Sequence, residues 1–198
     1  MLITNTKLTF TPGSVEKRAA KRRATKRIAI HHTVSGDVPA AEVHRWHQNR
    51  GWRGIGYHYL IRHSGAIERG RAEELRGIHA SAANADSIAI ALTGNFEQHL
   101  PTAAQLDALV WLIRDIRARY GDLVLIKHSD VGATACPGRL FPWTELQGRL
   151  ERRTHVVVSG DTLWALARQY DTTVAQLRKW NSLTADTIRV GQMLLVST

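Results

Sequence analysis

The sequence predicts an α/β protein with a central β-sheet, followed by a small β-α-α-β unit. Short apolar runs at 28–30, 88–92 and 123–126 are typical of buried strands. Between the second and third of these runs, residues 102–119 carry apolar side chains at helical spacing. Strands that alternate with helices indicate a sheet with helices packed against it. The hydrophobic content of 43% is sufficient to form such a core.

The N-terminal region is predicted to be a basic arm over 1–25. Residues 1–27 hold eight Lys or Arg and one Glu, whereas residues 28–150 hold thirteen basic and twelve acidic residues. Residues 1–13 are expected to be extended, and Ser14 is a candidate cap for a short helix over 16–23. An arm of this charge indicates an anionic partner, such as an anionic envelope component or nucleic acid, or else a solvated basic face.

The folded domain is expected to alternate strands and helices up to about residue 150. A glycine-rich loop over 51–56 and a small-residue loop over 77–84 interrupt the pattern. The expected elements, in order, are a strand over 27–31, a helix from Pro39 to about Arg50, strands over 57–61, 66–69 and 87–92, a helix capped by Thr102 and ended by Gly121, and a strand over 123–126.

A charged boundary at 151–153 separates a second, small unit. Its expected elements are a strand over 155–158, a helix from Asp161 or Thr162, a helix from Thr173 and a strand over 193–196. This unit has apolar residues for a core but no cluster of titratable groups that could perform chemistry. A binding role is therefore predicted for it.

A candidate metal site lies around the single cysteine, Cys136. It follows His128 by eight residues in a segment rich in Gly, Ala and Pro, and the pair His31-His32 ends another apolar run. Two imidazoles and one thiolate would hold zinc and leave one position open for water. The alternative is a hydrogen-bonded core histidine and an inert buried thiol.

Ordered short motifs between residues 26 and 145 resemble one known family. The motifs are His31-His32-Thr33, Trp46-His47, Gly51-Trp52, Ile55-Gly56-Tyr57-His58, His79-Ala80, Asn84, Ser87-Ile88, Gly94-Asn95-Phe96 and His128 followed by Cys136-Pro137-Gly138. Together they resemble the zinc-dependent N-acetylmuramoyl-L-alanine amidases, a family that includes phage endolysins and animal peptidoglycan recognition proteins. The resemblance implies a central mixed β-sheet flanked by helices, and a catalytic domain over 26–150.

The resemblance also implies an activity and a metal site. The reaction is hydrolysis of the amide bond between N-acetylmuramic acid and L-alanine of the peptidoglycan stem peptide. One Zn²⁺ per chain is expected on His31, His128 and Cys136. His32 is expected to face the other way, because side chains alternate along a strand.

Further residues are assigned by the same resemblance. Tyr57 falls on the catalytic tyrosine, and Thr134 occupies a polar catalytic position that is Lys in some phage enzymes. Thr134 can donate a hydrogen bond but brings no positive charge. The substrate groove is expected to include Trp52, His79 and Asn84.

Residues 154–198 are similar to a LysM module, which binds glycans that contain N-acetylglucosamine. Val157–Ala167, Trp180–Leu183 and Ile188–Gln192 carry the similarity. Trp164 and Trp180 are expected to pack in the core. By resemblance, the glycan lies between two loops, with contacts expected from Gly160, Asp161, Thr162, Asn181 and Ile188.

The expected setting is the bacterial cell wall. The N-terminus lacks the pattern of a signal peptide, no apolar run is long enough for a transmembrane segment, and a single cysteine fits synthesis in a reducing cytoplasm. We expect an endolysin made in the host cytoplasm and released to the wall. Alternatives are a bacterial wall-recycling or prophage-encoded amidase, or a non-catalytic recognition protein. Specific nucleic-acid binding is not expected, because residues 28–150 are nearly neutral.

Overall fold

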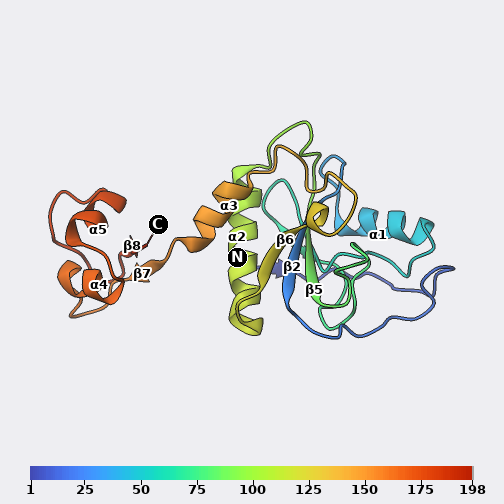
Figure 1. Cartoon of the computed structure of the whole chain (residues 1–198), viewed down its shortest axis with the longest axis horizontal. Helices are drawn as coiled ribbons and strands as arrows, with labels where there is room; N and C mark the ends of the chain where they lie inside the picture. The colour runs from blue at the N-terminus through green and yellow to red at the C-terminus, as the bar shows by residue number, and fades with distance from the viewer. Residues whose placement is uncertain (198) are drawn as a thin grey trace. The chain divides into compact units, whose positions relative to one another are not determined.

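A computed structural model describes residues 1–197, which form two compact units, Met1–Pro142 and the chain from Trp143 onward (Figure 1). Thr198, the last residue of the predicted second domain, lies outside the described residues. Within the described chain no helix is both long and apolar enough to cross a membrane. The elements of the first unit are β1 (Ile3–Thr4), β2 (Arg27–His32), α1 (Ala40–Asn49), β3 (Tyr59–Ile61), β4 (Ile67–Arg69), β5 (Ser87–Leu92), α2 (Ala103–Tyr120), β6 (Val124–Lys127) and the 3₁₀ helix η1 (His128–Asp130).

The first unit is built on a six-stranded mixed sheet in the order β1-β4-β3-β5-β2-β6. Only β3 and β4 pair antiparallel, and the other neighbours are parallel. Helices α1 and α2 lie on opposite sides of the sheet (Figure 1). The predicted fold class, a central mixed sheet flanked by helices, is therefore confirmed.

The two central strands are asymmetric across the sheet. Alternation along β2 and β5 places isoleucines on one face and alanines on the other, and all of these residues are fully buried. On the alanine face, Ala91 packs with Ala40 and Val43 of α1, and Ala29 packs with the loop residue Ala83. Small side chains on this face leave room for the large rings that follow at the strand ends.

The N-terminal segment differs from its prediction, because residues 16–23 form no helix. The segment is extended, and its backbone hydrogen-bonds the loop before β5: Arg22 N–H donates to Glu74 O at 2.8 Å, and Ala20 O accepts from Arg76 N–H at 2.7 Å. Glu16 also forms an ion pair with Arg71, which is 1% exposed. A helix here would have no large apolar residues to bury, so these tertiary bonds prevail over local propensity.

The second unit has the predicted β-α-α-β order. After α3 (Trp143–Glu151) come β7 (Thr154–Val156), α4 (Leu163–Gln169), α5 (Val174–Trp180) and β8 (Met193–Leu195). Strands β7 and β8 pair antiparallel, and Leu166, Leu177 and Leu194 form the centre of a separate core. Trp180 packs against this core as predicted, but the prediction for Trp164 is wrong. Trp164 is 63% exposed, and Arg168 lies over its ring.

Candidate active site

The predicted metal ligands come together at one edge of the sheet. Strands β2 and β6 are parallel neighbours, and Ile30 pairs with Lys127, so His31 and His128 are the next residues in register. The carboxyl ends of parallel strands meet at the same edge, where ligand sites of such sheets commonly lie. Cys136 reaches the same place from the loop after η1. The candidate ligand atoms of the two histidines and the cysteine all lie within 4.8 Å of one another.

The donor set fits Zn²⁺. Zn–N and Zn–S bonds of about 2.0–2.1 and about 2.3 Å put a nitrogen and a sulfur about 3.6 Å apart on a tetrahedron. The distance between His31 Nδ1 and Cys136 Sγ is 3.6 Å. Burial raises the pKa of the Cys136 thiol to about 11. A bound cation would favour the thiolate, so the cluster has the composition of a metal site rather than of a free reactive cysteine.

Hydrogen bonds hold the cysteine loop against the strand ends. Ser129 N–H donates to Cys136 O at 2.9 Å, which joins the His128 and Cys136 segments. His32 N–H points at the cysteine Sγ over 3.4 Å. The His32 ring lies on the opposite face of the sheet, as alternation requires, and its Nδ1 accepts from Phe96 N–H at 3.1 Å.

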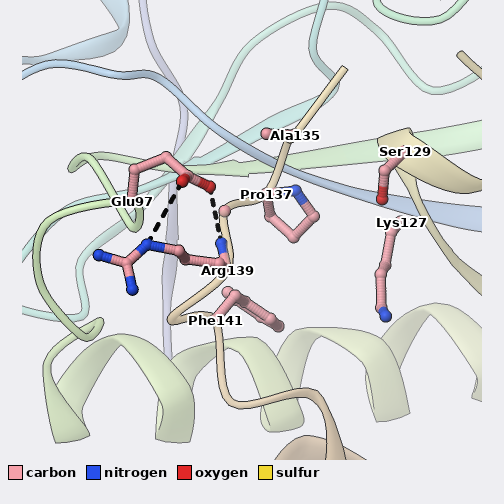
Figure 2. A pocket seen from close by; sticks show the side chains of 8 residues that line it. Glu97, Lys127, Ser129, Ala135, Pro137, Arg139 and Phe141 are labelled. Carbon is pink, nitrogen blue, oxygen red and sulfur yellow. Dashed lines mark hydrogen bonds and ion pairs between the residues drawn. The ribbon is translucent and has the colours of Figure 1, made fainter. Parts of the chain in front are cut away.

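The far side of this loop lines a cavity of about 340 Å³ (Figure 2). Its wall includes Lys127 and Ser129, which flank His128, and Pro137, which follows Cys136. The cavity therefore borders the segments that carry two of the three candidate ligands. Arg139 and Glu97 are paired across the cavity, with Arg139 N–H donating to Glu97 Oε1 at 2.7 Å. This pair ties the end of the cysteine loop to the loop after β5.

Tyr57 lies beside the cluster. Its ring centroid is 5.1 Å from that of His31 and 5.4 Å from that of His47. Burial raises the pKa of the Tyr57 hydroxyl, and the neighbouring Cys136 raises it further. The phenol therefore keeps its proton and can act as a hydrogen-bond donor next to the cluster.

Thr134 is placed on the same loop as Cys136 but is exposed. Its Oγ1 accepts from Cys136 N–H at 3.2 Å, which stabilises the turn that presents the sulfur. The hydroxyl can still donate its own hydrogen.

The three residues predicted to bind substrate occupy different positions. His79 lies directly behind His31, with His79 Nδ1 3.0 Å from His31 Nε2, and burial lowers the pKa of His79 well below its usual value. Asn84 Oδ1 accepts from the backbone N–H groups of His79 and Ala80 at 2.8 and 3.0 Å. Trp52 packs on the His47 ring with centroids 4.6 Å apart.

Trp52 and Asn84 line a cavity of about 320 Å³ whose other wall is the N-terminal segment. Its charged lining residues are Lys17, Arg18 and Arg76 together with Glu16, so basic side chains outnumber the carboxylate. The three basic residues were not predicted as site residues. The excess of Lys and Arg before residue 27 was the signal, but the sequence did not show that this segment folds back along the loop at 76–84.

Three other histidines of the domain have structural roles. His44, His47 and His58 each accept a backbone N–H through Nδ1, from Ile55, Gly56 and Ala89 respectively. Burial lowers the pKa of His47 to about 3 and that of His58 to about 4, so both rings are neutral acceptors at physiological pH.

In the second unit, most of the predicted glycan contacts have side chains that already serve the fold. Asn181 bonds both Leu195 N–H and Leu195 O, Asp161 accepts from Val158 N–H, and Thr162 caps α4. Gly160 and Ile188 carry no such bond. The loop at 183–192 borders a cavity of about 540 Å³. The side chains of Asp161, Thr162 and Asn181 are thus already engaged in hydrogen bonds within the unit.

Comparison with known proteins agrees with this architecture. Residues 21–139 match the N-acetylmuramoyl-L-alanine amidase family model, and residues 155–197 match the LysM domain. The chain is similar to the endolysin of Klebsiella phage KP32, with 34% identity over 125 residues that cover 59% of this chain and 83% of that protein. It is also similar to a peptidoglycan-recognition protein of Drosophila simulans, with 36% identity over 57% of this chain and 68% of that protein.

A solved structure of an N-acetylmuramoyl-L-alanine amidase is also similar to this chain. The amidase LysC from Clostridium intestinale matches with a TM-score of 0.71 and 35% identity, over 76% of this chain and 97% of that one. The mixed sheet and the family match together define an amidase-type fold, and the His-His-Cys cluster lies at the edge of this sheet. The chain belongs to the N-acetylmuramoyl-L-alanine amidase family and is a peptidoglycan hydrolase of the endolysin type.

Proposed function

We propose that this chain uses one Zn²⁺, held by His31, His128 and Cys136, to hydrolyse the amide bond between N-acetylmuramic acid and L-alanine. The proposal depends on one observation: the imidazole of His31 on β2, the imidazole of His128 directly after β6 and the only thiol in the sequence have ligand atoms within 4.8 Å of one another. A non-catalytic recognition protein would not need this complete donor set.

Zinc bound at this site would supply a Lewis acid for the scissile carbonyl and for the attacking water. Tyr57 donates its hydroxyl hydrogen to the carbonyl oxygen as negative charge develops there, because its raised pKa keeps the proton in place. Thr134 is assigned the role of a second donor to the same region, and it also orients Cys136 through their 3.2 Å hydrogen bond.

The substrate is proposed to extend from the metal cluster into the cavity bordered by Trp52 and Asn84. Lys17, Arg18 and Arg76 give this cavity positive charge, which suits the carboxylates of a stem peptide. The basic segment thus contributes to the substrate site, in addition to any contact with anionic envelope components. The LysM module is proposed to hold the enzyme on N-acetylglucosamine-containing glycan through the backbone of its two loops.

The proposed setting is a phage infection: synthesis in the host cytoplasm, release, and action on the wall. The phage endolysins among the relatives support this setting.

Mass spectrometry of digested sacculi tests the reaction. The expected products are stem peptides with a new L-alanine amino terminus and glycan strands with free lactyl carboxyl groups. New reducing sugar ends, or new peptide ends within the stem, would exclude the proposal. Cys136→Ser is the matched control, because it keeps the shape but replaces a soft sulfur with a hydroxyl that ionises poorly, so zinc content and activity should fall together.

A further inference from the structure

A chain of hydrogen bonds leads away from His31. The Nδ1 atom of the His31 ring faces Cys136 Sγ, and the Nε2 atom lies 3.0 Å from His79 Nδ1. The other ring nitrogen of His79 lies 3.2 Å from Ser87 Oγ. Ser87 Oγ lies 2.6 Å from the carbonyl oxygen of Ala83. The ring of His79 and the hydroxyl of Ser87 thus connect a candidate metal ligand to a backbone carbonyl.

The position of every proton in this series of hydrogen bonds follows from its last acceptor, the carbonyl oxygen of Ala83. A carbonyl only accepts, so Ser87 donates its single hydroxyl hydrogen to Ala83 O. Ser87 Oγ must then accept from His79, which places the His79 proton on Nε2. A neutral imidazole carries one N–H, so His79 Nδ1 is an acceptor and His31 Nε2 is the donor to it. His31 therefore presents an unprotonated Nδ1 towards Cys136.

We propose that His79 is a positioning residue: together with Ser87 and the Ala83 carbonyl it fixes His31 in the Nε2–H tautomer that metal ligation through Nδ1 requires. This inference rests on the proposed metal site. The opposite tautomer would place a hydrogen on the nitrogen that faces Cys136. Metal-binding histidines need a partner for their second N–H, and loss of that partner weakens metal affinity.

Strand register explains why a histidine fills this position. His31 pairs with Ala91, and Ser87 lies four residues earlier on the same face of β5. Four residues of strand span about 13 Å, too far for a direct bond between His31 and Ser87. The imidazole of His79 bridges the gap with a nitrogen at each end. Asn84, bonded to the His79 backbone, holds the loop that carries both His79 and Ala83.

The role proposed for His79 differs from the substrate contact that the family resemblance predicts. Its two ring nitrogens are both engaged within the protein, by His31 and Ser87. A substrate contact through the ring would require one of these hydrogen bonds to break.

The test compares zinc affinity of the full chain with His79→Leu and His79→Gln. Leucine removes the acceptor, and we expect the zinc dissociation constant to rise about 10–100-fold, as for loss of other such partners. Glutamine offers an amide oxygen to His31 and an amide N–H to Ser87, so it should recover most of the affinity. Competition with a chelator measures the constant, at a temperature where circular dichroism shows each variant folded.

A matched control separates positioning from general stability. His58 is another fully buried histidine whose two ring nitrogens bond Ala89 N–H and Leu75 O, so they take no part in the hydrogen bonds from His31 to Ala83, although the His58 ring lies edge-on to that of His79 with centroids 6.3 Å apart. His58→Leu should lower the melting temperature but leave the zinc constant unchanged. Unchanged zinc affinity in His79→Leu, or equal loss in the leucine and glutamine variants, would overturn the inference. Unchanged zinc affinity in Cys136→Ser would instead reject the donor set itself.

Spectroscopy of the zinc-loaded wild-type protein gives a test without mutation. Long-range ¹H–¹⁵N correlations of the imidazoles should report Nε2–H tautomers for both His31 and His79. An Nδ1–H signal from His79 would contradict the proton order deduced from Ser87 and Ala83.

Discussion

In the proposed reaction, the Tyr57 hydroxyl donates to the carbonyl oxygen and does not bind the metal. Its ring packs beside His31, while the candidate ligand atoms that the described residues bring together belong to His31, His128 and Cys136. Tyr57→Phe should therefore retain zinc near one ion per chain, while amidase activity falls on the order of 100-fold, the usual scale for loss of one transition-state donor. Metal analysis beside a dye-release assay on sacculi checks both expectations. Loss of zinc in this variant would place Tyr57 in the metal shell instead.

The residues of the cluster were predictable, but their supports were not. His31, His128 and Cys136 follow apolar runs or stand alone in composition, so the sequence signals them directly. Ser87 was noted only as part of a motif, because its role depends on a loop that returns to β5 and brings Ala83 O within 2.6 Å. A backbone carbonyl is present in every residue type, so a contact that it makes cannot be predicted from the amino-acid sequence.

At the scale of elements, the N-terminal segment acts as part of the fold. Arg71 donates to both carboxylate oxygens of Glu16, at 2.6 and 2.8 Å, and to Ile55 O at 3.0 Å. Glu16→Gln would leave the guanidinium of Arg71 buried without a counter-charge. We expect a loss of about 3 kcal/mol in the free energy of unfolding. Thermal unfolding should show a fall of roughly 6–12 °C in melting temperature.

Lys17→Gln is the control for that change. Of Lys17, only the backbone carbonyl is engaged, by Arg53. Its melting temperature should match the wild type, whereas equal losses for both variants would mean that any substitution in this segment destabilises the fold and that the buried pair has no special part.

The hydrogen bonds of the Glu73 carboxylate, which connect the loop after β4 to α2 and β3, predict that the stability of the fold falls in acid. Burial alone raises the pKa of Glu73, but hydrogen bonds from Arg119, Tyr59 and Tyr120 outweigh it and lower the pKa from 4.5 to about 2. A carboxylate with a lowered pKa stabilises the fold fully above its unfolded value and loses that contribution as pH falls towards the folded one. The stability that Glu73 contributes should thus disappear between about pH 4.5 and pH 2.

Glu73→Gln makes this expectation measurable. On zinc-free protein, the difference in unfolding free energy between wild type and variant should be about 2 kcal/mol near neutral pH, after allowance for the partly exposed Arg119, and should shrink below pH 4.5. Urea unfolding across pH 2–7 gives the comparison. A difference independent of pH would show that the lost packing, not the charge, matters.

Elements were predicted well where the apolar pattern is long and poorly where tertiary contacts decide. The capped helix α2 and the strands β2, β5 and β6 follow directly from their periodicity. The helix expected over 16–23 is absent, because the backbone there bonds Glu74 and Arg76 instead. Trp164 is exposed although its neighbours Leu163 and Leu166 are buried, since a seven-residue helix buries only one side.

At the scale of the molecule, the two units have separate cores. A chain truncated after Glu151 should keep its zinc and hydrolyse small soluble muropeptides at a rate near that of the full chain. It should sediment less with intact sacculi, because the LysM loops are missing. Co-sedimentation at matched ionic strength measures the difference, and equal sedimentation of both versions would assign wall binding to the catalytic unit.

The Ala83 carbonyl has a consequence for mutational mapping of the enzyme. Of the four groups that run from His31 to Ala83, three belong to side chains and respond to substitution, while the last is common to all twenty residue types. Ala83→Gly should leave zinc affinity intact, so a substitution scan would score position 83 as silent. Replacing the amide between residues 83 and 84 with an ester weakens that oxygen as an acceptor and also removes the Asn84 N–H that donates to Ala80 O at 2.8 Å, so the change in zinc affinity would report on both bonds. The Ala83 carbonyl thus contributes to this site through the path of the backbone and not through the side chain at position 83.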